Sequence, residues 1–436
     1  MGNSKKSNTK PTSRRKFLKR TGLAVGAITI LPRHVFGRGF VAPSDRVNLG
    51  FIGLGKQVTG LSRVFLENTT DAQIIAGCDV WSTKREWFKS YVEKNYAEKR
   101  NLMNYKGVST TGSYEELLKR PDIDAVVIAT PDHWHAIQAI AAMNSGKDVY
   151  CEKPMTLTIK EGIDMVKTTK KTGSVLQVGS MQRSWQKFQK AVELVSKGYI
   201  GDISKVLVNV GDPAIPFNMA SEETPKEVDW NAWCGPAPLL PYNNRLSPST
   251  SEGFFPDWRK FSETGGGILT DWGAHMFDIA QWGLGMDRSG PVRFEPPKDR
   301  SAVRGMRMIY ENGIEMIHED FGRGWGVRFI GSKGNLDISR GYLETNPTNI
   351  LTAELETSNT VLDESRGNHY QNWLDAIKDR SQPICDVEIG HRSASIGNIC
   401  NIAYQLGRPL DWNPEKEKFI GDKEANKMKK RKNRKF

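Results

Sequence analysis

The stretch Val47-Asn48-Leu49-Gly50-Phe51-Ile52-Gly53-Leu54-Gly55 decides the fold of this chain. Its apolar run predicts a β-strand that breaks at glycines, and the residues that follow carry apolar side chains at helical spacing. A strand, a glycine turn and a helix together bind a dinucleotide diphosphate, because unpaired backbone N–H groups at the helix start face the anion. Gly53 allows the tight turn and Gly55 lets the diphosphate approach, but Val58 stands where the pattern has a third glycine. A lone glycine pattern is weak evidence, so the rest of the chain has to support it.

Length and charge limit the possible classes of protein. A chain of 436 residues is long enough for two domains with separate cores. Of the net charge of +12, residues 1–45 carry +9 and residues 421–436 carry +6, which leaves −3 for the body. A mildly acidic body with basic ends does not form a groove that follows phosphates, so we expect no nucleic-acid partner.

Cysteine spacing and apolar runs limit the classes further. The five cysteines are scattered without metal-ligand spacing, and we expect them to be buried free thiols. No apolar run is long enough for an ordinary membrane span, so stable membrane insertion is not expected.

The N-terminal segment predicts a targeting signal. Ser13-Arg14-Arg15-Lys16-Phe17-Leu18-Lys19 resembles the twin-arginine export signal, and a moderately apolar stretch follows it from Gly22 to Leu31. Residues 1–40 are therefore interpreted as a signal and linker, with a disordered basic tail as the alternative. This predicts a periplasmic or exported protein that meets the twin-arginine translocation machinery. That route carries folded proteins, which suits an enzyme with a tightly held cofactor.

Residues 46–158 alternate strand and helix patterns, which predicts a Rossmann domain. Ala72 to Cys78 is the second expected strand, and it ends at Asp79. An acid at this strand end accepts hydrogen bonds from ribose hydroxyls and repels a 2′-phosphate, which favours NAD over NADP. A solvated aspartate at a strand end is the alternative interpretation.

Two more strand ends carry candidate residues. The strand Asp124 to Thr130 stops at Pro131-Asp132-His133-Trp134-His135, and a helix is expected from Ala136 to Ser145. The strand Asp148 to Cys151 leads directly into Glu152-Lys153-Pro154. In open α/β sheets ligands bind beyond the carboxyl ends of the strands. The predicted cofactor-binding residues are therefore Gly53, Leu54, Gly55, Lys56, Gln57, Asp79, Thr130, Pro131, Asp132, His135, Glu152 and Lys153.

Three motifs in order resemble the Gfo/Idh/MocA oxidoreductases, the relatives of glucose–fructose oxidoreductase and inositol dehydrogenase. The motifs are Ile128 to His135, Glu152-Lys153-Pro154, and Gly265-Gly-Gly-Ile-Leu-Thr-Asp271-Trp-Gly-Ala-His275. The resemblance implies an α/β fold, with an N-terminal Rossmann domain and a C-terminal α/β domain that has a large open, mostly antiparallel sheet. It also implies a homo-oligomer, bound NAD(P), and hydride transfer at a sugar or cyclitol carbon.

The resemblance assigns catalytic roles to Lys153, Asp271 and His275, and it makes Gln182 and Arg183 candidates for binding sugar hydroxyls. The chemistry of the residues agrees, because Asp271 and His275 share a helix face and a carboxylate beside an imidazole raises its basicity. The alternative is that Asp271 caps the helix and His275 is a core histidine. Asp278 continues the same face, but a metal site is not favoured and no metal is predicted.

The second domain is expected at residues 159–412. Residues 213–260 form a long insertion rich in proline and tryptophan, from which Trp258 and Arg259 are predicted to hold a sugar ring and its hydroxyls. Residues 303–345 alternate as antiparallel strands do. Residues 413–436 are interpreted as a basic C-terminal tail, whose lysine-rich end from Lys427 to Lys435 is a solvated tail or an oligomer arm.

Three functions are compatible with these residues. The first is an exported NAD-dependent oxidoreductase that acts on a ring hydroxyl of a sugar, glycoside or cyclitol and recycles its cofactor in place. The second is an NAD-dependent glycosidase that oxidises, eliminates and then reduces. The third is a non-catalytic sugar-binding protein on the same fold, which the presence of Lys153, Asp271 and His275 disfavours.

Overall fold

The computed structural model describes residues 46–67, 69, 71–352 and 368–436. The proposed export signal lies outside the described residues. Residues Val47–Phe436 form one compact unit with two β-sheets. No described helix is both long enough and apolar enough to cross a lipid bilayer.

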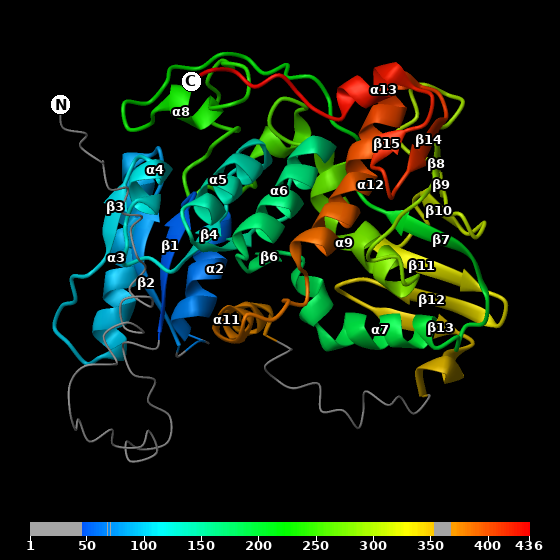
Figure 1. Cartoon of the computed structure of the whole chain (residues 1–436), viewed down its shortest axis with the longest axis horizontal. Coiled ribbons are helices and arrows are strands. Elements are labelled where there is room, and N and C mark those ends of the chain that lie inside the picture. Colours follow the sequence, from blue (N-terminus) through cyan, green and yellow to red (C-terminus); the bar gives the residue numbers. More distant parts are fainter. Residues whose placement is uncertain (1–45, 68, 70, 353–367) are drawn as a thin grey trace, which may run out of the picture. The chain divides into compact units, whose positions relative to one another are not determined.

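The first sheet is parallel, and its strand order β3-β2-β1-β4-β5-β6 is that of a Rossmann domain (Figure 1). Its strands are β1 (Val47–Ile52), β2 (Ala72–Cys78), β3 (Ser109–Thr111), β4 (Ala125–Ile128), β5 (Asp148–Cys151) and β6 (Leu176–Val178). The helices between them are α2 (Lys56–Glu67), α3 (Ser82–Lys99), α4 (Tyr114–Leu118), α5 (Asp132–Asn144) and α6 (Ile159–Thr172).

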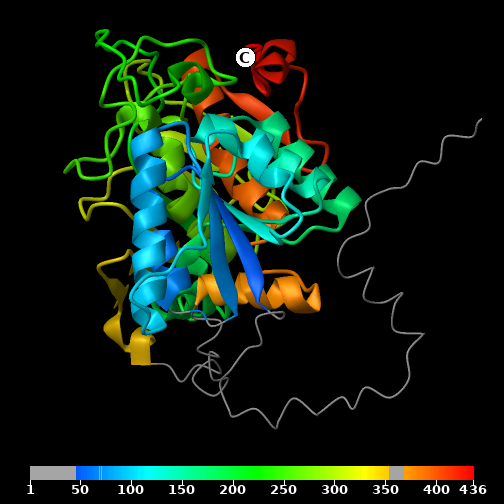
Figure 2. The same cartoon turned by 90° about the vertical axis from the view of Figure 1, so that its left-hand side faces the viewer.

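Alternate residues of each strand supply two separate apolar clusters. Ala125 and Val127 of β4 pack with α2 and α3, whereas Val126 and Ile128 pack with α4, α5 and α6. The helix α11 (His369–Asp379) lies against the first of these faces (Figures 1 and 2), where its Trp373 is fully buried. The continuous apolar runs of these strands are explained by burial on both faces.

The second sheet is mostly antiparallel, with the order β13-β12-β11-β7-β10-β9-β8-β14-β15. Its strands are β7 (Ile203–Asn209), β8 (Arg293–Glu295), β9 (Met306–Ile309), β10 (Glu315–His318), β11 (Gly326–Gly331), β12 (Gly334–Ile338), β13 (Leu343–Asn346), β14 (Leu410–Asn413) and β15 (Lys418–Phe419). Only β7 and β10 pair in parallel among the strand pairs of this sheet within the described residues. The predicted fold class is confirmed.

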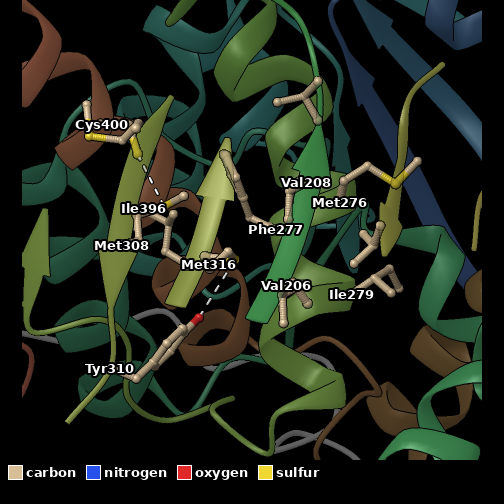
Figure 3. Close-up of a cluster of buried hydrophobic side chains, with 14 of the residues drawn as sticks. Val206, Val208, Met276, Phe277, Ile279, Met308, Tyr310, Met316, Ile396 and Cys400 are labelled. Atoms are coloured by element: carbon tan, nitrogen blue, oxygen red, sulfur yellow. Dashed lines mark hydrogen bonds between the residues drawn. The ribbon is translucent and has the colours of Figure 1, made fainter. Parts of the chain in front are cut away.

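Two long helices, α9 (Gly267–Gly283) and α12 (Val387–Leu406), pack against each other; α12 contacts β6 of the first sheet and β8 of the second, and α9 contacts β7 and β11 of the second sheet. Figure 3 shows Phe277 of α9 and Ile396 of α12 packed with Val206 and Val208 of β7 and with Met316 of β10. The remaining helices are α7 (Gln186–Ser196), α8 (Trp230–Cys234) and α13 (Lys423–Met428), with short 3₁₀ turns at Met181–Ser184, Asp257–Lys260 and Thr348–Thr352. All five cysteines lie in the described residues and are buried free thiols, as predicted.

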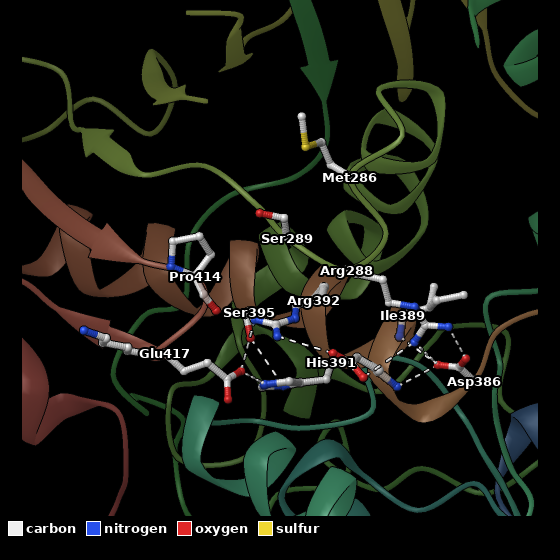
Figure 4. A network of polar contacts seen from close by, with 12 residues as sticks. Met286, Arg288, Ser289, Asp386, Ile389, His391, Arg392, Ser395, Pro414 and Glu417 are labelled. Atoms are coloured by element: carbon white, nitrogen blue, oxygen red, sulfur yellow. Dashed lines mark hydrogen bonds and ion pairs between the residues drawn. The ribbon is translucent and has the colours of Figure 1, made fainter. Parts of the chain in front are cut away.

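A polar network fixes the chain end to α12. Figure 4 shows Arg288 paired with Asp386, the residue that caps α12, at 2.5 Å. His391 contacts Glu417, and Arg392 donates to the carbonyl oxygen of Pro414 at 2.6 Å. These contacts order the residues after β14, which the sequence analysis assigned to a basic tail.

Three boundaries differ from the sequence prediction. The helix expected from Ala136 begins at Asp132 instead, because the side chains of its first turn are buried and stabilise that turn. The first domain extends past residue 158, since β6 pairs in parallel with β5. Residues 413–436 also form β15 and α13, whose Phe419 and Ala425 are buried in the core of the second sheet, so the first part of the predicted tail is folded.

Candidate active site

The glycine turn after β1 has the geometry that a dinucleotide needs. Gly53 has a φ of +84°, and a Cβ at this position would lie 2.6 Å from the backbone nitrogen of Thr130. Only glycine therefore lets this turn lie against the end of β4. A Cβ on Gly55 would meet open space, so the backbone there is accessible to a ligand. Val58 is fully buried against the sheet, which shows that helix and strand pack closely without the third glycine.

Asp79 at the end of β2 is held beside this turn. Its Oδ2 accepts from the backbone nitrogen of Leu54 at 2.6 Å, and its Oδ1 accepts from that of Trp81 at 2.9 Å. Lys84 and Arg85 line the same part of the cavity. Lys84 donates to the hydroxyl of Ser247 at 3.1 Å, and burial lowers its pKa even though Asp79 raises it.

The end of β4 supplies the side of the cleft. Asp132 is buried with no partner for Oδ1 within the described residues, and its pKa lies well above the usual value because of burial and, next, the charge of Asp271. The imidazole of His135 lies between the carbonyl oxygens of Pro154 and Thr130, each at 2.7 Å. Burial lowers the pKa of His135 to about 4, although both carbonyl oxygens raise it, and a neutral ring can donate to only one of the two.

Lys153, Asp271 and Arg259 form a charged cluster at the contact between the two parts of the fold. The Nζ of Lys153 lies 2.9 Å from Oδ1 of Asp271 and donates to the Asp271 carbonyl oxygen at 2.9 Å. The Nε of Arg259 lies 3.4 Å from the same Oδ1. Burial raises the pKa of Asp271, but Lys153 and Arg259 outweigh burial and hold that pKa below its usual value. Asp271 is therefore ionised and fixes both cations.

His275 contacts Arg340 and not Asp271, which corrects the expected aspartate–histidine pair. Nη2 of Arg340 lies 3.0 Å from Nε2 of His275, while Nδ1 of His275 is buried with no partner within the described residues. Because guanidinium groups only donate, Nε2 must accept and Nδ1 must carry the proton. Burial, followed by the charges of Lys153 and Arg340, lowers the pKa of His275 well below its usual value. His275 is a neutral imidazole in this state.

Two predicted sugar-binding residues are not placed at the cavity surface. Arg183 is buried, with its Nε 2.8 Å from Asp278 and its Nη2 2.7 Å from Asp287. Asp278, the third polar residue on this face of α9, is buried because it pairs with Arg183. The Oε1 of Gln182 accepts from Nε of Arg340 at 3.2 Å. The hypothesis that Gln182 and Arg183 meet sugar hydroxyls is therefore corrected, since both side chains are already used in positioning other protein groups.

One cavity of about 1040 Å³ joins these groups. Its lining includes the predicted residues Gly53, Gly55, Lys56, Gln57, Asp79, Thr130, Pro131, Asp132, His135, Glu152, Lys153, Trp258, Arg259, Asp271 and His275. Pockets for small molecules are commonly about 300–1,000 Å³, so this cavity lies at the large end of that range. Leu54 is buried beneath the turn and presents only its backbone nitrogen to Asp79.

The cavity has aromatic and basic residues that the sequence analysis missed. Trp272 and Trp325 lie together with ring centroids 4.3 Å apart, and the guanidinium of Arg340 lies 4.6 Å from the Trp272 centroid. Phe255, which the sequence analysis also missed, lies 5.6 Å from the guanidinium of the predicted Arg259, which stacks on the predicted Trp258 at 4.3 Å. Trp272 stands inside the motif that ends at His275 and could have been singled out. No local signal marks Arg340, which lies 65 residues after His275.

The residues present fit a bound nicotinamide dinucleotide. The open backbone at Gly55, the unpaired buried Oε1 of Glu152 and the unpaired Nδ1 of His275 all belong to this cavity. Unpaired buried polar atoms are rare and need a partner. Across the described ranges, no group of three or more His, Cys, Asp or Glu side chains is arranged to hold a metal ion.

Two family models match most of the chain. Residues 47–180 match the model described as "Oxidoreductase family, NAD-binding Rossmann fold", and residues 214–436 match "Oxidoreductase family, C-terminal alpha/beta domain". Among curated proteins, "Glycosyl hydrolase family 109 protein" from Shewanella baltica is 30% identical over 210 residues, which are 44% of each chain. The protein of the same name from Shewanella putrefaciens is 31% identical over 210 residues. The aligned region thus spans less than half the length of these relatives.

Solved structures of similar fold include myo-inositol 2-dehydrogenase from Lactobacillus plantarum, with a TM-score of 0.57 and 19% identity over 84% of this chain and 99% of that one. The WlbA dehydrogenase from Bordetella pertussis, solved with NADH and UDP-GlcNAcA, has a TM-score of 0.59 and 17% identity over 84% and 98%. At this identity the two structures establish the shared fold. Because the two family models together cover most of the sequence, this chain belongs to the Gfo/Idh/MocA family of oxidoreductases.

Proposed function

We propose that this protein is an exported NAD-dependent oxidoreductase that acts on a ring hydroxyl of a sugar, glycoside or cyclitol. The observation that carries the proposal is that Lys153, Asp271 and His275 share one cavity with the glycine turn and Asp79. The names of similar proteins support a sugar-related substrate, since they include an inositol dehydrogenase and a dehydrogenase solved with NADH and UDP-GlcNAcA.

The glycine turn and the strand ends would hold the cofactor. Backbone groups from Gly53 to Gln57 would face the diphosphate, and Asp79 would meet the adenosine ribose, which favours NAD over NADP. Glu152 and Thr130 lie nearer Lys153 and would contact the nicotinamide half. When bound, the oxidised dinucleotide accepts the hydride that leaves the substrate carbon.

The chain's own residues handle the hydroxyl group. Lys153, fixed by Asp271, would direct its ammonium at the substrate oxygen and stabilise negative charge that develops there. The hydroxyl proton would pass to Nε2 of His275, while the carbon loses hydride and a carbonyl forms. Since Nε2 now accepts from Arg340, that guanidinium must turn to another acceptor before Nε2 can take the proton.

Aromatic residues around the cleft suit a sugar ring. The cavity is lined by Trp272, Trp325, Trp258 and Phe255, and arginines stack on several of these rings. Such faces stack on the C–H side of a pyranose while its hydroxyls bond outward.

Two measurements test this proposal: the nicotinamide dinucleotide content of the purified protein, and the oxidation of candidate sugars by it. We expect heat-denatured protein to release nicotinamide dinucleotide, and anaerobic incubation with candidate sugars to give NADH absorbance with a keto-sugar. His275→Ala should lower kcat about 10²- to 10⁴-fold while cofactor content is unchanged. Protein that contains no dinucleotide and binds none, or a His275→Ala variant with wild-type turnover, would contradict the proposal. The same variant also tests the non-catalytic alternative.

A second candidate is a glycosidase that uses a transient oxidation, elimination and reduction. The names of the curated relatives favour it, since they are called glycosyl hydrolase family 109 proteins. Incubation with aryl glycosides separates the two functions. Release of the aryl group without net NADH indicates the glycosidase, whereas NADH formed in proportion to keto-sugar indicates the dehydrogenase.

Export explains why the cofactor is expected to stay bound, because a protein outside the cytoplasm cannot exchange NADH with the cytoplasmic pool. We therefore propose that the cofactor is recycled in place by a second carbonyl compound or an internal cycle. Arg14→Lys with Arg15→Lys should keep the protein in the cytoplasmic fraction, whereas Lys5→Arg with Lys6→Arg should leave export unchanged. Equal export of both double variants would contradict a twin-arginine signal.

A further inference from the structure

Arg340 is a cation of the cleft that has no direct ion pair in the described residues. It follows β12 in the turn before β13 and donates to Gln182 and His275, both of which are uncharged acceptors. In the ranges that the structure describes, no carboxylate forms an ion pair with it. Its guanidinium lies over Trp272 at 4.6 Å and over Trp185 at 5.4 Å, and the residue remains partly exposed.

The other cations near His275 are already paired. Lys153 and Arg259 share Asp271, and Arg183 is bound by Asp278 and Asp287. Glu152 also lines this cavity. Burial lowers the pKa of Arg340, and the carboxyls of Asp271 and Glu152 both raise it, although neither forms an ion pair with it in the described residues. The cofactor diphosphate does not explain Arg340, because the expected diphosphate site is the glycine turn, where Lys56 lines the cavity.

We propose that Arg340 recognises a carboxylate on the substrate, so that the preferred sugar is an acidic one such as a hexuronate. The inference rests on the proposed function and narrows its substrate class. The planar fork of arginine fits a carboxylate with two parallel hydrogen bonds. The tryptophans beneath it provide a surface for the sugar ring that carries the carboxylate.

A substrate carboxylate also supplies the acceptor that Arg340 needs in order to leave His275. When the guanidinium donates to the carboxylate, the lone pair of Nε2 on His275 becomes available for the hydroxyl proton. Acidic and neutral sugars should therefore differ in kcat as well as in affinity.

Matched pairs of sugars test the proposal on the holoenzyme. D-glucose and D-glucuronate, D-galactose and D-galacturonate, and the corresponding methyl glycosides differ only at the exocyclic carbon. We expect at least one uronate to bind about 10- to 100-fold more tightly than its neutral partner by calorimetry, with a preference that weakens at high salt. Glucose 6-phosphate is included because a phosphate also fits an arginine.

Substitutions then assign the preference to Arg340. Arg340→Gln should abolish the ratio between the uronate and its neutral partner, and Arg340→Lys should retain part of it. Arg300→Gln removes the same charge from a surface arginine that, in the described part of the chain, donates hydrogen bonds to the backbone oxygens of Gln405 and Leu406, and should leave the ratio unchanged. A residue that merely positions His275 would change turnover of both sugars equally.

Three results would overturn the inference: neutral sugars that bind as tightly as uronates, a stronger response to glucose 6-phosphate, or a uronate preference that survives in Arg340→Gln. If a variant fails to fold, the binding of uronates and neutral sugars to the wild-type protein still tests whether acidic sugars are preferred. Oxidation of neutral sugars with no uronate preference contradicts this inference alone. Absence of bound dinucleotide and of any redox reaction contradicts the proposed function.

Discussion

At the scale of single residues, three glycines of the same turn and helix have different tasks. Gly53 has a positive φ and no space for a side chain, Gly55 has open space, and Gly60 lies on the exposed surface of α2. The fold therefore requires glycine at position 53, whereas at position 55 a ligand and not the fold requires the absence of a side chain.

Alanine at each of these positions should distinguish the two requirements. Gly53→Ala should destabilise the protein by about 1–3 kcal/mol and remove cofactor. Gly55→Ala should leave stability nearly unchanged while it weakens dinucleotide binding, because the new methyl group lies where the diphosphate approaches. Gly60→Ala, the control, should stabilise by about 0.5–1 kcal/mol. Urea unfolding and cofactor content measure both effects, and loss of stability in Gly55→Ala would contradict this assignment.

At the scale of elements, the C-terminal segment joins parts that are distant in sequence. Arg431 donates to the carbonyl oxygen of His133 at 2.7 Å and pairs with Glu161 at 3.4 Å. Arg434 donates to Gly235, Ala237 and Asn231, and the ring of Phe436 lies 5.0 Å from that of Trp134. This segment fastens α8 against α5 at the edge of the cavity, which Phe436 also lines.

Removal of one anchor should loosen this edge. Arg434→Ala loses its side-chain hydrogen bonds, and we expect stability to fall by about 1–3 kcal/mol with faster cofactor dissociation. Lys435→Ala, an exposed neighbour, should change stability by no more than about 0.5 kcal/mol. Thermal unfolding and the rate of cofactor loss on dilution measure the two effects. Equal behaviour of both variants would show that the segment does not stabilise this edge.

At the scale of the whole molecule, buried neutral histidines link folding to pH. Burial lowers the pKa of His133 to about 3 and the pKa values of His318 and His369 to about 4. An unfolded histidine titrates near 6.5, so the unfolded chain binds protons that the folded chain does not bind between these values. The free energy of unfolding that each neutral histidine contributes is therefore fully present above pH 6.5, and it is lost as the pH falls from 6.5 toward the pKa of the folded state.

His318→Gln should make the stability less dependent on pH. Its removal should reduce the slope of unfolding free energy against pH by about 1.4 kcal/mol per pH unit between pH 6 and 4.5. Tyr404→Phe removes the hydroxyl 3.0 Å from His318 without removing the titrating ring, so its slope should match the wild type. Urea unfolding at several pH values measures the slopes. An unchanged slope in His318→Gln would contradict the link.

Self-association remains a prediction, and the second sheet indicates where it would occur. Alternate residues of the strands face α9 and α12, which leaves Leu207, Ile309, Ile317 and Ile330 on the other face, with Ile317 opposite Leu207. Ile317→Arg should lower the mass measured by light scattering to that of one chain, while Glu311→Arg in the turn between β9 and β10 should not. A wild-type protein that is monomeric at micromolar concentration would contradict the expectation.

The sequence by itself determined the order of strands and helices, the glycine turn, and the strand ends where Asp79 and Lys153 stand. These depend on local periodicity, on backbone conformations that favour glycine, and on the rule that parallel strands end at one edge, all of which a short stretch expresses. Only the tertiary structure decided that Asp271 pairs with Lys153 and Arg259, that Arg340 meets His275, that Arg183 is buried in an ion pair, and that Arg431 reaches His133. These partners are separated by tens to hundreds of residues, and long charged side chains choose among many possible neighbours according to burial and space. No local pattern records that choice, so it becomes visible only when the sheets and helices have brought the side chains together.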